Sequence, residues 1–286
     1  MSTTTAVKKT FKPSRLVRHV PSVSTLLAGA VLVFLVVAAI FPTIWAPGDP
    51  TAIDPSKALQ PPSWGNIFGT DSNGRDLYTR VVHGTRESMF IGLGAASLAM
   101  LIAIVVGGGA ALGGKVADRL LGGLIEVNLA FPTVLLALLV MAIVGPSKAT
   151  LIFAVGVGAA PGYARMVRGQ VLSVRQDAYI EAARALGHSR SRITFQHVVP
   201  NALRPLIAIF ALGVGQAIVW ASGLAFLGLG VPPPSPEWGA LLEAGRNYIT
   251  SAWWLEVVPG VAIAVTAVSI TVLSRNIQSH LEGGKK

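Results

Sequence analysis

Long apolar runs constrain the fold of this chain more than any other feature. Stretches of about twenty apolar residues recur along its 286 residues, and about twenty residues are needed for a helix to cross a hydrocarbon core of about 30 Å. The runs are apolar all round, whereas a helix of a soluble domain has a polar face. Only 13% of the residues are charged, about half the share in a typical soluble domain. We therefore expect an all-α integral membrane protein.

Six membrane-spanning helices can be placed on these runs. The first is expected over residues 23–45 as a retained signal anchor, because its apolar run is too long for a signal peptide and no cleavage site follows. The other five form a core over residues 88–276. They are expected at Ser88–Leu112, Gly123–Ile143, Thr150–Val167, Leu203–Leu229 and Val257–Leu273.

The distribution of positive charge predicts the topology. Most of the 23 basic residues precede the first span or follow the second, fourth and sixth, and short basic loops stay in the cytoplasm. Both termini are therefore expected to be cytoplasmic, as tails over residues 1–22 and 277–286. Residues 46–87 and 230–256 are expected outside. The net charge of +10 follows from this rule, so we expect contact with the lipid bilayer and none with nucleic acid.

The sequence offers no catalytic or metal-binding constellation. It has no cysteine, and its five histidines lie outside the spans without the spacing of zinc ligands. The run Gly109–Lys115 resembles a phosphate-binding loop, but Val116 stands where Ser or Thr would bind magnesium, and no strand precedes it. The chain is therefore not expected to be an enzyme, to bind a metal or to carry a cofactor, and any ATP and magnesium would be bound by other subunits.

A polar segment at residues 170–200 interrupts the apolar pattern and must be used in water. A helix is expected over Gln176–Leu186, with Gly187 as its C-cap. The small side chains of the alanines within it would leave a flat surface that another protein can approach closely. Glu181 can pair with Arg184 or with a cation of a partner.

Further helix is expected beyond that glycine. Ser189 can cap a stretch over Arg190–Val198, and Pro200 then opens the next span.

The two outer segments and the spans carry fewer signals. Prolines prevent helix continuation in both outer segments, and the second contains Trp238, Trp253 and Trp254, which we expect at the membrane interface. Polar residues are sparse within the spans, and Asn128 and Gln216 are the candidates for a translocation pathway. The lack of a buried charge network argues against a proton- or sodium-coupled carrier.

Several motifs carry a family resemblance. Glu181-Ala-Ala183, three residues, Gly187 and then Pro200 resemble the EAA loop of ABC importer permeases. His197-Val-Val-Pro-Asn201 is similar to the dipeptide/oligopeptide branch (the peptide/nickel family), and Gly69-Thr-Asp-x-x-Gly-Arg-Asp76 resembles the C-type subunit of that branch. The resemblance covers about residues 25–275. The tail, Ser274-Arg-Asn-Ile-Gln-Ser-His280, departs from the usual ending of the family.

The resemblance implies a type I permease with six transmembrane helices in a bacterial inner membrane. Its partners would be a homologous second permease, two cytoplasmic ATP-binding subunits and an extracytoplasmic substrate-binding protein. It implies ATPase coupling through the loop at 170–200, with these residues: Glu181, Ala182, Ala183, Gly187, His197 and Pro200. It further implies an outer gate or a binding-protein contact at Gly69, Asp71, Gly74, Arg75 and Asp76, although a purely structural loop is nearly as good an interpretation of those residues.

The resemblance implies import of dipeptides and oligopeptides, with other solutes as alternatives. Importers of nickel chelates, opines, glutathione and some sugars share the branch, and the substrate-binding protein normally sets specificity. A stand-alone carrier and an exporter are the alternatives from other classes. The exporter is disfavoured by the importer-type loop and by the lack of a fused ATPase.

Overall fold

The computed structural model describes residues 22–283, with side chains through residue 279. The expected N-terminal tail therefore lies outside the described residues except for Ser22, and the tail at 277–286 lies partly outside them. No strand occurs in the described part of the chain. The helices are α1 (Val23–Ile40), α2 (Pro42–Trp45), α3 (Leu77–Leu112), α4 (Gly114–Leu129), α5 (Thr133–Val144), α6 (Lys148–Arg175), α7 (Ala178–Ala185), α8 (Arg190–Ile193), α9 (Val199–Leu203), α10 (Leu206–Leu224), α11 (Trp238–Gly245) and α12 (Trp254–Gly283).

Five helices in the described residues are long and apolar enough to cross a bilayer: α1, α3, α6, α12, and α10 with its π-helical extension to Leu229. The expectation of an all-α membrane fold is confirmed. Helices α3, α6 and α12 extend beyond their expected spans. Helix α1 ends at Ile40, before the expected Trp45, and α10 begins at Leu206, after the expected Leu203. Helix α3, for example, begins at Leu77 and not at Ser88, because the Asp76 side chain accepts a hydrogen bond from the Thr79 N–H and caps the helix there.

The third expected span is not one continuous helix. Helices α4 and α5 meet at an angle of 87° across a break of a few residues, so the expectation of a straight helix over Gly123–Ile143 is wrong. Pro132 explains the break, because it lacks an N–H and disfavours helical conformation at Phe131. The number of spans reaches six only when this bent pair counts as one.

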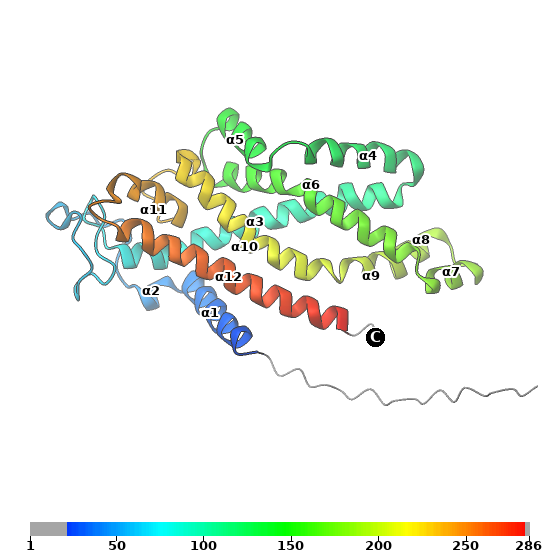
Figure 1. Ribbon diagram of the computed structural model, residues 1–286, viewed down its shortest axis with the longest axis horizontal. Coiled ribbons are helices and arrows are strands. Elements are labelled where there is room, and N and C mark those ends of the chain that lie inside the picture. Colours follow the sequence, from blue (N-terminus) through cyan, green and yellow to red (C-terminus); the bar gives the residue numbers. More distant parts are fainter. Residues whose placement is uncertain (1–21, 284–286) are drawn as a thin grey trace, which may run out of the picture.

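The chain places its two polar regions at opposite ends of an elongated molecule (Figure 1). One end carries loop 46–76 and α11, and we call it the outer end. The other carries α7 and α8, and we call it the coupling end. The start of α1 and the end of α12 are joined by a hydrogen bond from Asn276 Nδ2 to Thr25 Oγ1 at 3.4 Å. Both helix ends point toward the coupling end in Figure 1, as expected for termini that share a side of the membrane.

Three apolar clusters hold this arrangement together. One lies at the coupling end and joins α7–α9 to α3, α4 and α6. A second joins α3, α11 and α12 at the outer end around Trp238 and Trp254. The third packs α3, α5, α6 and α10 against one another. Both polar ends are therefore seated on packed helices, which fixes their geometry.

Candidate functional site

Helix α7 at the coupling end is short and has a defined stop. It spans Ala178–Ala185, slightly less than the expected Gln176–Leu186. Gly187 follows with φ of +77°, its N–H donates to Arg184 O at 3.0 Å, and His188 N–H donates to Ala183 O at 3.2 Å. This pair of bonds is the Schellman motif, which requires a residue in the left-handed region. The expectation that Gly187 ends the helix is confirmed.

The two alanines of the motif lie on different faces of α7. Ala182 and Glu181 are exposed, whereas Ala183 is 6% exposed and packs with Ile180 in the cluster beneath the helix. Ala183 is therefore not part of an outward surface, because successive helical residues lie about 100° apart. Its small side chain lets α7 sit close to the rest of the protein.

Charge and apolar surface around α7 differ from the sequence-based picture. Among the described residues, no ion pair joins Glu181 to Arg184, and Arg184 Nη2 instead donates to Arg175 O at 3.5 Å. Leu186 and Phe195 are 77% and 72% exposed beside it. The sequence did not single them out, because their exposure depends on how α7 and α8 fold back on the bundle.

Beyond Gly187, the chain turns into α8 as expected. Ser189 Oγ accepts from Arg192 N–H at 3.4 Å, so Ser189 is the cap, but the helix continues as a π-helical turn over Thr194–Val198. His188 and His197 stack at 6.1 Å between ring centroids with 9° between ring planes. Pro200 is exposed in the first turn of α9. The structure thus brings His197 next to the end of α7.

A basic cavity lies under this turn. It measures about 610 Å³, and its lining includes Arg175, Arg184, His188 and Arg190 beside the turn between α3 and α4. Arg175 donates to the carbonyl of Ala111 at the end of α3. The cavity contains no acidic lining residue, so it favours an anionic group from outside the chain.

The motif residues at the outer end form a buried ionic cluster around Asp71. Its Oδ2 accepts from Arg75 Nε at 2.7 Å and from Arg80 Nη1 at 2.5 Å, and the three residues are 5%, 7% and 3% exposed. Burial alone raises the pKa of Asp71, but hydrogen bonds from the Arg75 N–H and side chain, together with both arginine charges, outweigh it and lower the pKa. Asp71 is therefore held as a carboxylate.

The remaining residues of that motif are structural. Gly74 has φ of +73°, and a Cβ there would lie 1.8 Å from Asp54 O. Gly69 also has a positive φ, and a Cβ there would lie 2.7 Å from Gln60 O. Asp76 caps α3. The loop therefore needs these three residues to fold, which supports the structural interpretation for them and leaves Asp71 and Arg75 as the motif's chemically distinctive members.

Two of the three expected interface tryptophans are buried. Trp238 is 0% exposed and its Nε1 donates to Val81 O at 2.9 Å, while Trp254 is 5% exposed and its Nε1 donates to Thr70 O at 3.2 Å. The interface expectation is wrong for both, because these indole N–H groups complete the outer-end packing. Trp253 is 54% exposed.

Glu237 starts α11 beside these tryptophans. Its carboxyl accepts from the N–H groups of Gly239 and Ala240 and from Ser88 Oγ. Burial raises the pKa of Glu237, and those hydrogen bonds oppose the rise. The carboxyl thereby anchors α11 to α3.

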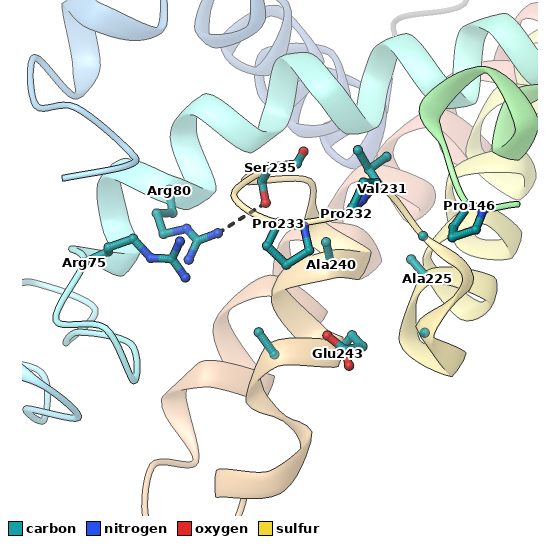
Figure 2. A pocket seen from close by; sticks show the side chains of 13 residues that line it. Arg75, Arg80, Pro146, Ala225, Val231, Pro232, Pro233, Ser235, Ala240 and Glu243 are labelled. Atoms are coloured by element: carbon teal, nitrogen blue, oxygen red, sulfur yellow. Dashed lines mark hydrogen bonds between the residues drawn. The ribbon is translucent and has the colours of Figure 1, made fainter. Parts of the chain in front are cut away.

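An outer cavity of about 310 Å³ opens next to the Asp71 cluster (Figure 2). Arg75 reaches it from the loop before α3, Arg80 from the first turn of α3, and Glu243 from α11. Arg80 Nη2 donates to Ser235 O at 3.2 Å on its rim. The sequence placed Arg80 and Glu243 in no site, since only the tertiary fold brings α11 to α3.

The two expected pathway residues are not brought together. Asn128 lines a small apolar cavity between α3, α4 and α6, and its Nδ2 donates to Leu124 O at 2.8 Å. Gln216 is exposed on α10 and is not among the lining of that cavity. Ion pairs instead join α4 to α6: Asp118 to Arg168 at 2.6 Å and Glu126 to Arg165 at 3.3 Å.

Solved structures share this fold. An inward-facing MetNI methionine ABC transporter covers 71% of this chain and 96% of its own with a TM-score of 0.57 at 20% identity. An amino acid ABC transporter solved with histidines covers 70% of this chain and 94% of its own with a TM-score of 0.58 at 13% identity. The fold is therefore that of ABC transporter membrane subunits.

Sequence relatives cover most of the chain. The probable D,D-dipeptide transport system permease protein DdpC of Escherichia coli (strain K12) is 38% identical, over 92% of this chain and 89% of the relative. The di/tripeptide transport system permease protein DppC of Pseudomonas aeruginosa is 35% identical, over 90% and 87%. The glutathione transport system permease protein GsiD of Pectobacterium atrosepticum is 35% identical, over 80% and 76%.

The family assignment rests on the same core that carries the coupling end. Residues 99–286 match the family described as the inner membrane component of binding-protein-dependent transport systems. This range includes α7, α8 and the helices beneath them. Together with the relatives, the match shows that the chain is a multi-pass membrane permease subunit and belongs to the binding-protein-dependent transport family of ABC importers.

Proposed function

We propose that this permease carries dipeptides and oligopeptides inward across a bacterial inner membrane, as half of a translocation pathway completed by a homologous second permease. The support for a peptide substrate is the similarity to dipeptide and di/tripeptide permeases at 35–38% identity over about nine-tenths of the chain. ATP and magnesium would be bound by two separate cytoplasmic subunits, and an extracytoplasmic binding protein would deliver the substrate.

The observation that carries the coupling role is the exposed surface of the segment from α7 through the π-helical turn after α8. Glu181, Ala182, Leu186 and Phe195 are all exposed at the coupling end, whereas Ile180 ties the same helix to the bundle. Large exposed apolar side chains within a charged surface are typical of a docking site for another protein. The basic cavity beside them would receive an anionic side chain of the ATP-binding subunit.

Rigid seating of α7 is what would transmit force. Closure of the ATP-binding subunits moves α7, and α7 shares its apolar cluster with α3, α6 and α9. Because packed interiors do not deform continuously, the movement would reach the spans and change access to the pathway. Gly187 and the buried Ala183 contribute by fixing how α7 sits, whereas Glu181 and Ala182 would make direct contact.

Glutathione import is the second candidate, favoured by the 35% identity to GsiD. Glutathione is itself a modified tripeptide with free carboxylates, so both candidates are zwitterionic peptides. The nickel-chelate, opine and sugar alternatives have no relative among those described above.

Reconstituted uptake tests the proposal. The permease pair, both ATP-binding subunits and the binding protein are placed in proteoliposomes, and uptake of labelled Ala-Ala and of glutathione is measured with and without ATP. We expect ATP-dependent uptake of Ala-Ala that requires the binding protein. Uptake by the permease without the ATP-binding subunits would establish a stand-alone carrier instead, and uptake of glutathione alone would select the second candidate.

A further inference from the structure

The Asp71 cluster at the outer end carries a charge imbalance. Asp71 is one buried carboxylate between two buried guanidinium groups, and no other acidic residue forms an ion pair with either arginine in the described residues. The cluster therefore has a net charge of about +1, although its three side chains are almost fully buried. An uncompensated buried charge is costly, and one more anion nearby removes that cost.

Both arginines have donors without a hydrogen-bond partner in the described residues. Arg80 Nε is buried without a hydrogen-bond partner. The terminal amino groups of Arg75 donate to no described residue, and both side chains line the 310 Å³ cavity. In Figure 2 the two guanidinium groups lie side by side at one edge of it. Two adjacent guanidinium groups with spare N–H donors match the geometry of a carboxylate.

Glu243 supplies the opposite charge across the same cavity. Its carboxylate forms no hydrogen bond or ion pair with the described part of the protein, and it is half-buried on α11. Figure 2 shows it on α11, apart from the two arginines and below Pro233 and Ala240 in that view. The cavity thus has a cationic edge and an anionic edge that do not neutralise each other.

The rest of the lining is small and apolar. Pro146, Ala225, Val231 and Pro232 form much of the wall. Apolar walls with a few convergent polar groups, in a volume of about 300–1,000 Å³, are typical of small-molecule sites. Gly228, which has φ of +84°, and Gly230 border the cavity beyond the end of α10.

We propose that this cavity is a receiving site for a zwitterionic solute, the free carboxylate of a short peptide binding at Arg75 and Arg80 and its ammonium group binding at Glu243. The inference rests on the proposed peptide substrate and adds where the permease itself holds it. The site lies where α3, α10 and α11 meet at the outer end, so a solute released there would be retained before it enters the pathway.

Direct binding tests the site without the binding protein. The assembled transporter in nanodiscs, free of ATP and of binding protein, is titrated with Ala-Ala, N-acetyl-Ala-Ala and Ala-Ala amide, and binding is followed by saturation-transfer NMR. We expect Ala-Ala to bind and each blocked analogue to bind about tenfold more weakly, the usual effect of one lost charge-assisted hydrogen bond.

Variants identify the residues. Glu243→Gln is expected to weaken Ala-Ala about tenfold and to leave N-acetyl-Ala-Ala unchanged, because only the former has an ammonium group. Arg75→Gln is expected to weaken both of these free-carboxylate ligands. Arg246→Gln is the control, because Arg246 is exposed on the turn after α11 and is not part of the cavity. Thermal unfolding of Glu243→Gln should match the wild type, since its side chain bonds to nothing.

The outcomes separate this inference from the proposed function. If Ala-Ala does not bind, or if Glu243→Gln behaves as Arg246→Gln does while the wild type still imports Ala-Ala in proteoliposomes, the receiving site is refuted and peptide import stands. If Arg75→Gln instead weakens only docking of the binding protein, the cavity holds a carboxylate of that protein, which also refutes it. Failure of wild-type import with intact Ala-Ala binding would refute peptide import alone.

Discussion

Replacement of Gly187 measures how much the geometry of α7 matters for coupling. The residue has φ of +77°, and a Cβ there would meet no atom within 4 Å, so a substitution adds backbone strain and no clash. For an L-residue that strain is about 1–2 kcal/mol. If the end of α7 unwinds to relieve the strain, the fraction of permease with α7 in the conformation that docks the ATP-binding subunit falls by up to about 5–30-fold.

Three side chains separate strain from bulk at this position. Asn tolerates the left-handed region, so Gly187→Asn should couple nearly as the wild type does. Gly187→Ala should weaken coupling by up to about 5–30-fold, and the β-branched Gly187→Val should weaken it more. Gly169→Ala is the matched control, because Gly169 lies within α6 without a positive φ and a Cβ there meets nothing. It should be neutral or slightly stabilising.

The assay is the affinity of the purified ATP-binding subunits for the reconstituted permease pair, together with peptide uptake per ATP hydrolysed. Both should decline in the order Asn, Ala, Val, while the thermal unfolding temperature of the permease changes little. Equal affinity and uptake for Gly187→Val and Gly187→Asn would show that the conformation of the C-cap does not control docking.

Four further predictions rest on contacts and exposure at Asp71, Trp238 and Leu186. Asp71→Asn removes the charged partner of two buried arginines and should lower the free energy of unfolding by about 3 kcal/mol. This is the lower end of the range for a broken buried ion pair, because the cavity admits water. Unfolding of the purified permease in detergent measures the change. Folding lowers the pKa of Asp71. The ionised carboxylate therefore stabilises the folded protein fully above its unfolded pKa, and this contribution is lost as the pH falls through the folded pKa. The wild type should lose stability below about pH 4, and Asp71→Asn should lose less. Trp238→Phe removes the indole donor to Val81 O, which still accepts from Thr85 Oγ1, and should lower the free energy of unfolding by about 0.5–1.5 kcal/mol. Leu186→Asp should weaken docking of the ATP-binding subunits about tenfold without unfolding the permease, because Leu186 is 77% exposed.

Controls for the Trp238 and Leu186 variants come from exposed tryptophan and apolar positions elsewhere in the chain. Trp253→Phe at an exposed tryptophan should leave unfolding unchanged, and Ile53→Asp at an exposed apolar position of the outer end should leave docking unchanged. Equal destabilisation by Trp253→Phe and Trp238→Phe would contradict the role of the Val81 bond. A docking loss in Ile53→Asp equal to that in Leu186→Asp would contradict the location of the interface at the coupling end.

The spans were predictable because bilayer crossing imposes a simple length and composition requirement on the chain. Gly187 was predictable as a helix end because its conformation is a local property. The break at Pro132 was missed, although proline is its cause, because the apolar run continues through it and hydropathy does not register a bend. The buried face of Ala183 and the indole bonds of Trp238 and Trp254 were missed because each depends on a partner far away in the sequence.

The candidate sites divide in the same way. The sequence alone determined a multi-pass helical membrane protein with a polar segment at residues 170–200, since membrane spans and helix caps follow from local sequence. Only the tertiary structure decided that Leu186 and Phe195 are exposed beside α7, and that Arg75, Arg80 and Glu243 share one cavity. The physical reason is that charge compensation and exposure are set by which helices pack together, and α3 and α11 are about 160 residues apart in the chain.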